Sequence, residues 1–420
     1  MSRRRVLMTA YACEPGLGSE AGIGWNWVAQ ASRFDEVWVI TRANNRAAIE
    51  VALRQQPQPH VHWVFFDLPR AVCFWKRGPR GARLYYYLWQ CSIYKLARRL
   101  HARVRFDLVH HVTFGAYWMP TWIGRLNVPF VWGPVGGGEC GPESLQRTFS
   151  LQGRAYEHLR DIVRNLAERL PAIRSAARSA RLALATTEET AARLRVLGAS
   201  TVEVLSHVAL SIADIERLAN VPERTCGPLR LVSIGRLLHW KGIHLGLEAF
   251  ARLRVTLPDA EYWIVGVGPE RERLQRLADR LGLGQSVRFL GAVSRREVFE
   301  VIAECDALVH PSLHDSGGYV CAEAMAAGRP VICLDLGGPG LLVSDDSGIR
   351  IPAGTPERTI ASLAAAMIRL ASDPQLRHRL GSGAKQRARQ SLSWERNGVL
   401  LDRLYEAVVD SRSEPIRVCR

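Results

Sequence analysis

The sequence has no Cys-x-x-Cys pair and no uninterrupted run of apolar residues long enough to span a membrane. Its nine cysteines are scattered along 420 residues, which argues against a zinc site or a paired redox motif. We therefore expect reduced, mostly buried thiols. The most apolar stretch, residues 116–135, is broken by Arg125, Asn127 and three prolines, so no transmembrane helix is predicted. The apolar run behind the N-terminal arginines is short, and we expect a first strand there and not a signal peptide.

Acidic residues are absent between Asp67 and Asp107, where cations alternate with aromatic residues. The segment includes the cations Lys76, Arg77, Arg80, Arg83, Lys95, Arg98 and Arg99 and the aromatics Phe74, Trp75, Tyr85, Tyr86, Tyr87, Trp89 and Tyr94. Such a mixture is typical of a surface that lies on an anionic membrane, so residues 70–105 are predicted to make that contact. The alternative is a solvated basic helix whose aromatics face the core. A nucleic-acid partner is not expected, because no nucleic-acid motif accompanies the charge.

The charge imbalance extends over the whole N-terminal half. Residues 1–205 hold 28 Lys and Arg against 15 Asp and Glu, a net charge of +13. The remaining residues hold 28 against 25, a net charge of +3. The basic character therefore belongs to one half of the chain.

The most informative segment that is present runs from Ser312 to Ile332, where seven residues separate Asp315 from Glu323. A glycine pair follows Asp315, and an alanine-rich helix, predicted to stop at Gly328, carries Glu323. Backbone N–H groups at a helix start attract phosphate, and a carboxylate just beyond can accept two hydrogen bonds from a vicinal diol. Phosphate together with a diol describes a nucleotide.

A second element lies upstream, where a strand from Leu231 to Ile234 ends at Gly235. Arg236 and Lys241 follow in the turn before the next predicted helix. Cations at the carboxyl end of a strand and facing a helix start suit a diphosphate. Arginine can grip two oxygens, while lysine supplies a point charge.

These two elements resemble the motifs of retaining, family 4-like glycosyltransferases (glycosyl transferases group 1) of the GT-B fold. The resemblance implies an α/β protein with two Rossmann-like parallel-sheet domains that face an interdomain cleft. It also implies that Arg236 and Lys241 neutralise the leaving nucleoside diphosphate. Glu323 would bind the ribose, and Asp315, in place of the family's first Glu, would contact the donor sugar. The other predicted donor-binding residues are Gly16, Gly18, Gly235, Gly266, Gly268, Ser316, Gly317, Gly318, Tyr319 and Val320.

The N-terminal half has its own glycine-rich turn after a strand over Val6–Ala10. Its spacing does not match the dinucleotide fingerprint, which argues against a dehydrogenase. The resemblance places this loop at the diphosphate and Glu20 at the acceptor. A further strand ends at His110 and His111, one of which would contact the donor sugar or the acceptor. We favour His111 as the catalytic one and His110 on the acceptor side, with the choice between them open, because alternation turns at least one into the core.

Strands alternate with helices in both halves, which predicts parallel sheets. In the second half, Ser294 and Glu297 are predicted to form a capping box at the start of a helix. We predict an acceptor-side domain over 1–210 and a donor-binding domain over 211–392. A C-terminal helix, 393–412, is expected to pack back on the first domain.

The predicted function is metal-independent transfer of a sugar from a nucleotide diphosphate-sugar to a hydroxyl acceptor. The acceptor would be a lipid-linked or polysaccharide intermediate of bacterial surface or exopolysaccharide synthesis. The protein would be cytoplasmic and peripheral on the inner face of the cell membrane. No Asp-x-Asp motif and no metal cluster occurs in the sequence, so neither a metal nor another cofactor is expected.

Two alternatives stay open. One is a sugar-nucleotide epimerase or hydrolase on the same fold. The other is a non-catalytic sugar-nucleotide-binding subunit of a polysaccharide assembly complex, suggested by Asp315 standing where the family has Glu. The nucleotide base, the donor sugar, the linkage and the oligomeric state do not follow from these residues.

Overall fold

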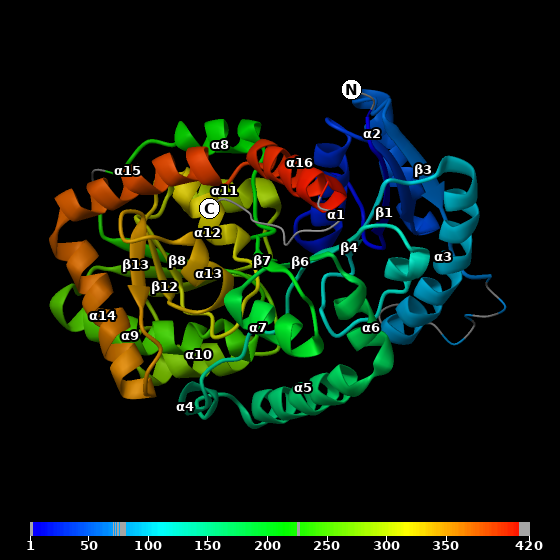
Figure 1. Ribbon diagram of the computed structural model, residues 1–420. Coiled ribbons are helices and arrows are strands. Elements are labelled where there is room, and N and C mark those ends of the chain that lie inside the picture. Colours follow the sequence, from blue (N-terminus) through cyan, green and yellow to red (C-terminus); the bar gives the residue numbers. More distant parts are fainter. Residues whose placement is uncertain are drawn as a thin grey trace. The chain divides into compact units, whose positions relative to one another are not determined.

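The computed structural model describes residues 3–69, 71, 73, 75, 81–224 and 227–410 (Figure 1). Contacts along the chain divide it into two compact units. Unit 1 contains Met1–Gly138, Asp161–His207 and Trp394–Arg420, and unit 2 contains Glu139–Arg160 and Val208–Ser393. The predicted domains, 1–210 and 211–392, are proposed as independently folding parts, and this stays a prediction.

Unit 1 is built on a seven-stranded parallel sheet in the order β3-β2-β1-β4-β5-β6-β7. Its strands are β1 (Arg5–Ala10), β2 (Glu36–Thr41), β3 (Val61–Phe65), β4 (Leu108–Thr113), β5 (Phe130–Val135), β6 (Leu182–Ala185) and β7 (Val202–Val204). Its α-helices are α1 (Ser19–Ala31), α2 (Arg46–Gln55), α3 (Ala82–Val104), α6 (Pro171–Ser179), α7 (Glu188–Leu197) and α16 (Trp394–Asp410). The last helix packs beside α1, where the rings of Trp27 and Trp394 meet edge to face at 5.4 Å (Figure 1).

Unit 2 has a six-stranded parallel sheet in the order β10-β9-β8-β11-β12-β13. The strands are β8 (Arg230–Ile234), β9 (Glu261–Val265), β10 (Val287–Gly291), β11 (Ala307–His310), β12 (Val331–Leu334) and β13 (Gly348–Ile351). The α-helices are α4 (Glu143–Gln146), α8 (Ile212–Ala219), α9 (Ile243–Thr256), α10 (Arg271–Arg280), α11 (Arg295–Ala303), α12 (Tyr319–Ala326), α13 (Gly337–Leu342), α14 (Pro356–Ser372) and α15 (Pro374–Ser391). Helix α5 (Leu151–Arg169) has residues in both units.

Two sheets of this kind confirm the predicted α/β class with two Rossmann-like parallel sheets. The predicted capping box is also present, because the Ser294 side chain accepts from the Glu297 N–H and the Glu297 carboxylate accepts from the Ser294 N–H. None of the seven described cysteines forms a disulfide, and four of them are buried.

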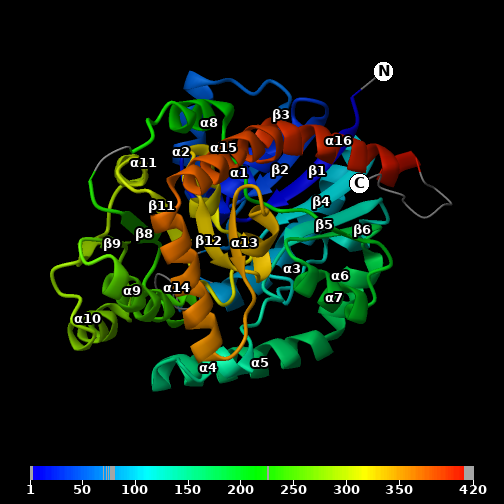
Figure 2. The same cartoon turned by 90° about the vertical axis from the view of Figure 1, so that its left-hand side faces the viewer.

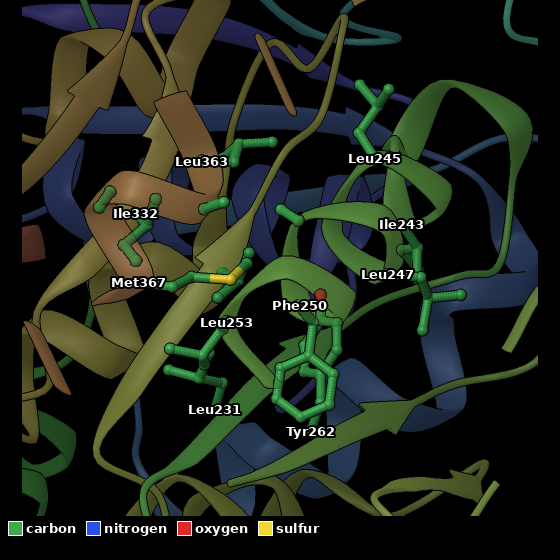
Figure 3. Close-up of a cluster of buried hydrophobic side chains, with 14 of the residues drawn as sticks. Leu231, Ile243, Leu245, Leu247, Phe250, Leu253, Tyr262, Ile332, Leu363 and Met367 are labelled. Atoms are coloured by element: carbon green, nitrogen blue, oxygen red, sulfur yellow. The ribbon is translucent and has the colours of Figure 1, made fainter. Parts of the chain in front are cut away.

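One core cluster of unit 2 lies between its sheet and the helix pair α9 and α14, which pack side by side (Figure 2), and a second joins the sheet to α8, α11, α12 and α15. Phe250 of α9 packs against Tyr262 of β9, with ring centroids 5.3 Å apart, while Leu363 and Met367 of α14 face Ile332 (Figure 3). Full burial of such a side chain contributes about 1.5–3 kcal/mol. This packing fixes the strands whose carboxyl ends carry the predicted donor residues.

Strand order creates a switch point in unit 2. From β8 the chain builds outward through β9 and β10, and from β11 it builds in the other direction through β12 and β13. Since β8 and β11 are parallel neighbours, the turns that follow them leave the same edge of the sheet at adjacent positions. Ligands of open α/β sheets bind at such a point.

Candidate nucleotide-sugar site

The turn after β8 is shaped by glycines that nothing larger could replace. Gly235 has a φ of +148°, and a Cβ at Gly266 would lie 1.9 Å from the Gly235 carbonyl oxygen. A Cβ at Gly268 would lie 2.3 Å from the Leu237 carbonyl oxygen. Gly266 and Gly268 therefore let the turn after β9 lie directly against the turn after β8. Their contact with a donor stays a prediction.

Lys241 and Asp315 meet at the switch point. The Lys241 ammonium pairs with the Asp315 carboxylate, and His310 Nε2 lies 3.2 Å from the same carboxylate oxygen. Burial alone would raise the pKa of Asp315, but the Lys241 charge and the His310 hydrogen bond outweigh it and hold the pKa far below its usual range. Asp315 is therefore ionised at every working pH, and it holds Lys241 in place.

Arg236, in contrast, is exposed in the same turn. No hydrogen bond or ion pair joins its guanidinium to any residue that the structure describes. Its five N–H donors therefore remain available for a ligand anion. One of the two predicted cations is thus held in position, and the other is not.

The turn from Asp315 into α12 is supported from behind by the start of α13. The Gly338 N–H donates to the Asp315 carbonyl oxygen at 2.7 Å, and a Cβ at Gly338 would lie 2.2 Å from the Gly317 carbonyl oxygen. Gly318 caps α12 with a φ of +112°, a conformation that favours glycine. As predicted from the sequence, one turn leads into the N-terminus of a helix here, and it consists of Ser316, Gly317, Gly318, Tyr319 and Val320.

Glu323 lies one turn into α12 and is buried, with 8% of its surface exposed. Its carboxylate accepts no hydrogen bond from the described residues, and the nearest cation is Arg295, whose Nε lies 3.9 Å away. Arg295 also forms an ion pair with Asp214, whose carboxylate lies 3.1 Å from the Arg295 guanidinium. Burial raises the pKa of Glu323 to about 7, although Arg295 opposes the shift. A desolvated carboxylate with unused acceptor capacity would be stabilised by hydroxyl donors from a ligand.

A buried carboxylate that the sequence did not reveal supports both turns. Glu157 of α5 lies 2.8 Å from His239 Nε2 and 3.0 Å from His314 Nε2, and both contacts involve Oε1. Burial opposes ionisation of Glu157, but the hydrogen bonds from His239 and His314 and the nearby cations hold its pKa well below the usual range. The ring of Trp240 stacks on His314 at 5.1 Å. His239 is two residues from Lys241 and His314 adjoins Asp315, so Glu157 anchors both turns at once.

The predicted acceptor-side residues lie in unit 1, near the ends of β1 and β4. The Glu20 carboxylate accepts the Gly115 N–H, and burial raises the pKa of Glu20. Gly16, with a φ of +72°, and Gly18 are both exposed, and a Cβ on either would meet no atom within 4 Å. Their contacts with a donor or acceptor stay a prediction.

Both histidines of β4 are fully buried. His110 Nε2 donates to the Gly133 carbonyl at 2.5 Å, so its Nδ1 accepts from the Tyr405 hydroxyl at 2.6 Å. His111 contacts the Thr9 and Tyr86 hydroxyls at 2.8 and 3.3 Å. Burial lowers the pKa of His110 to about 4 and that of His111 to about 3, so both rings are neutral at physiological pH. A catalytic role for His111 stays a prediction.

The basic aromatic segment is only partly described, because Phe74, Lys76, Arg77 and Arg80 lie outside the described residues. In the described part, Tyr85, Tyr86 and Trp89 of α3 are buried in the core of unit 1. The exposed cations of this helix are Arg83, Lys95, Arg98, Arg99 and Arg103. Three aromatics of this helix thus turn inward, as the alternative of a solvated basic helix predicts, whereas Tyr87 is 39% exposed.

Metal ligation has no evident place in the described part of the chain, where no group of three His, Cys, Asp or Glu side chains lies close enough to hold an ion. Metal-independent transfer stays a prediction. The helices of the described residues also include none that is long and apolar enough to cross a membrane.

Comparison with curated proteins identifies relatives that transfer sugars. The glycogen synthase of Mycobacterium tuberculosis (strain H37Rv) is 30% identical over 190 residues, 45% of each chain. The lipopolysaccharide core biosynthesis glycosyltransferase LpsD of Rhizobium meliloti is 35% identical over 164 residues, 39% of this chain and 45% of LpsD. The chain thus matches less than half the length of these two relatives. The D-inositol 3-phosphate glycosyltransferase of Streptomyces bingchenggensis is 28% identical over 94% of this chain and 87% of its own.

Solved structures share the fold over nearly the whole chain. Sucrose-phosphate synthase from Thermosynechococcus elongatus has a TM-score of 0.66 at 20% identity and covers 96% of this chain and 98% of its own. HepE from Anabaena in complex with UDP has a TM-score of 0.59 at 20% identity and covers 96% and 99%. Residues 214–387, all in unit 2, match the family model described as "Glycosyl transferases group 1". Residues 214–387 are therefore a glycosyl transferases group 1 domain, and the chain as a whole has the GT-B fold.

Proposed function

We propose that the chain transfers a sugar from a nucleotide diphosphate-sugar to a hydroxyl acceptor with retention of the anomeric configuration. The observation that carries this proposal is the pair of acids on the two sides of the α12 N-terminus. Asp315 is ionised and bound to Lys241, whereas Glu323 is buried and lacks a hydrogen-bond donor among the described residues. A diphosphate fits the cation side of this arrangement, and a ribose diol fits the unsatisfied carboxylate.

The charge that grows on the leaving diphosphate would be stabilised by three kinds of donor in unit 2. These are the Arg236 guanidinium, the Lys241 ammonium and the N-terminal amides of α12. Lys241 keeps two N–H donors beyond the one directed at Asp315. Removing one preorganised donor of this kind lowers kcat roughly 10²–10³-fold. Each group can act without a metal, in accordance with the predicted mechanism.

In the transfer step, the bond between the anomeric carbon and the phosphate oxygen breaks, and the acceptor oxygen forms a bond to the same face of that carbon. The acceptor proton passes to the departing phosphate oxygen, so no separate base is required. In unit 1, Gly16 and Gly18 would contact the diphosphate. Glu20 would contact the acceptor. Both ring nitrogens of His110 and of His111 are bonded inside unit 1, so contact of either histidine with the acceptor or the donor sugar would require these bonds to open.

The acceptor is proposed to be a lipid-linked or polysaccharide intermediate of bacterial surface synthesis. LpsD, a relative in lipopolysaccharide core biosynthesis, supports this class. UDP-sugars are the first donors to test, because HepE has been solved with UDP and with UDP-glucose. The protein would then act at the cytoplasmic face of the membrane where such lipids are built.

Donor binding and transfer can be tested on the purified chain. UDP-, GDP- and ADP-sugars are screened by thermal shift, and the best donor is incubated with bacterial lipid extract, with product anomers assigned by NMR. We expect one nucleotide series to stabilise the wild type and to leave Glu323→Ala unchanged. Donor consumption without a transferred product would support a hydrolase or epimerase instead. Tight donor binding with no turnover on any acceptor would support a non-catalytic subunit.

A further inference from the structure

The second half of α5 exposes an apolar stripe on unit 1. Ile162, Val163 and Leu166 are 43%, 36% and 54% exposed, and Leu170, which precedes α6, is 48% exposed. The spacing of Ile162, Val163 and Leu166 places them on one face of α5, and Leu170 follows just beyond the end of that helix. The two helices follow one another in Figure 1. A surface helix normally turns such a face toward the core.

The opposite face of the same helix is polar and points inward. Arg164 has only 5% of its side chain exposed and pairs with Asp161 at 3.0 Å. Glu168 accepts a hydrogen bond from the buried Tyr117 hydroxyl at 2.5 Å and pairs with Arg193 at 3.5 Å. The helix is therefore oriented with its polar groups bound inside unit 1 and its apolar groups in solvent. An arrangement of this kind marks an interaction surface.

A basic groove adjoins the stripe. It has a volume of about 730 Å³ and is lined by Arg169, Pro171, Arg174, Ser175, Arg178 and Ser179. None of its three arginines forms an ion pair with a carboxylate in the described chain. Arg174 donates only to the Glu168 carbonyl, at 3.0 Å. The groove therefore carries uncompensated positive charge next to exposed apolar side chains.

We propose that this surface, Ile162, Val163, Leu166 and Leu170 with Arg169, Arg174 and Arg178, docks unit 1 on an anionic lipid bilayer. The apolar stripe would enter the boundary between headgroups and acyl chains, while the arginines would bind lipid phosphates. Anionic lipid is the occupant that complements both features. A second copy of the chain is disfavoured, because a symmetric contact would bring the same unpaired arginines together.

The docking surface is separate from α3, whose exposed cations are Arg83, Lys95, Arg98, Arg99 and Arg103. Tyr85, Tyr86 and Trp89 of this helix are buried, whereas Leu84 and Tyr87 are 55% and 39% exposed. The charge of α3 can attract a membrane from solution without inserting the buried rings. The α5–α6 surface adds a longer exposed apolar stripe beside its own arginines.

Co-sedimentation of the full chain with vesicles tests the proposal without any sugar donor. The vesicles contain phosphatidylcholine alone or an equal mixture with phosphatidylglycerol. We expect binding to the mixed vesicles, with the partition coefficient reduced about ten-fold or more by Leu166→Ser/Leu170→Ser. Arg169→Gln/Arg174→Gln/Arg178→Gln should reduce it roughly a hundred-fold at low salt. The matched control is Val255→Ser, an 85% exposed apolar residue of unit 2, which should bind as the wild type does.

Several results would overturn the proposal. They are absence of wild-type binding, equal binding to neutral vesicles, and unchanged binding in both multiple variants. If Leu166→Ser/Leu170→Ser converts a dimer to a monomer in sedimentation velocity and binds vesicles normally, the stripe joins two copies instead. Thermal unfolding checks that the variants fold, and these exposed positions should tolerate the substitutions. Because no sugar transfer is measured, failure here is distinct from failure of the proposed activity.

Discussion

Lys241 and Asp315 form an ion pair that joins two turns 74 residues apart in the sequence. The pair sits where β8 and β11 lie side by side, so the two motifs that suggested a nucleotide-sugar site share one edge of the unit 2 sheet. The contact gives Asp315 a role that the sequence comparison did not suggest, because the acid positions the cation. Contact between Asp315 and the donor sugar stays a separate prediction.

Asp315→Asn should separate charge from shape at this position. The amide retains the size of the acid but no longer neutralises Lys241, so the ammonium moves and turnover should fall about a hundred-fold. Stability should fall by about 1–3 kcal/mol. Asp315→Glu restores the charge and should recover part of the rate. The test is to measure initial rates of both variants and of the wild type. Wild-type turnover in Asp315→Asn would contradict the positioning role.

Arg236→Ala should affect catalysis alone. The side chain is exposed and has no partner in the described chain, so the free energy of unfolding should change by no more than about 0.5 kcal/mol. Turnover should fall about 10²-fold if the guanidinium stabilises the leaving diphosphate. Arg236→Lys should recover part of this loss. Arg280→Ala, an exposed arginine of α10, is the matched control and should keep full activity.

Nucleotide affinity should depend on the ionisation of Glu323. Its pKa is raised to about 7 in the free protein, and only the charged form can accept both ribose hydroxyls. Affinity should therefore weaken as pH falls below 7, by up to about ten-fold per pH unit. Calorimetric titrations with nucleoside diphosphate from about pH 5.5 to about pH 8.5 would show this slope in the wild type and not in Glu323→Gln. Glu300→Gln, on the exposed part of α11, is the control.

The features that followed from the sequence are those determined by neighbouring residues. The apolar strands, the turn at Gly235 and the helix start at Gly318 depend on local periodicity and on glycine conformations. The Ser294 capping box is likewise a contact between residues three apart. Each of these could be predicted because the chain segment contains both partners.

Other parts of the site depend on contacts that no local pattern encodes. Glu157 lies 82 residues from His239 and 157 from His314, on a helix whose sequence carries no motif that points to either histidine. His110 meets Tyr405 across 295 residues. Strand alternation predicts at least one core histidine in β4, and the structure buries both, with all six residues of the strand, because a central parallel strand is covered on both faces.

Glu157 should be necessary for positioning both donor-site turns. In Glu157→Ala the His239 and His314 N–H groups lose their acceptor, which should cost about 2–4 kcal/mol of stability. Turnover should fall as well, since the turns carrying Lys241 and Asp315 lose their shared anchor. Glu157→Gln retains one acceptor oxygen and should recover part of the turnover. Donor titrations of both variants below their unfolding temperature provide the measurement. Full turnover in folded Glu157→Ala would show that the contact is only structural.

The buried histidines should make the fold sensitive to acid. Burial lowers the pKa values of His110, His111 and His244 to about 4, 3 and 3, from an ordinary value near 6.5. Each ring is neutral in the folded protein but takes up a proton when unfolded. The stability that each contributes is therefore complete above about pH 6.5 and is lost as pH falls toward the folded pKa, at about 1.4 kcal/mol per pH unit. Denaturant titrations should show a shallower loss between these limits for His110→Gln than for the wild type. His158→Gln, an exposed histidine of α5, should leave the slope unchanged, and equal slopes for all three proteins would contradict the assignment.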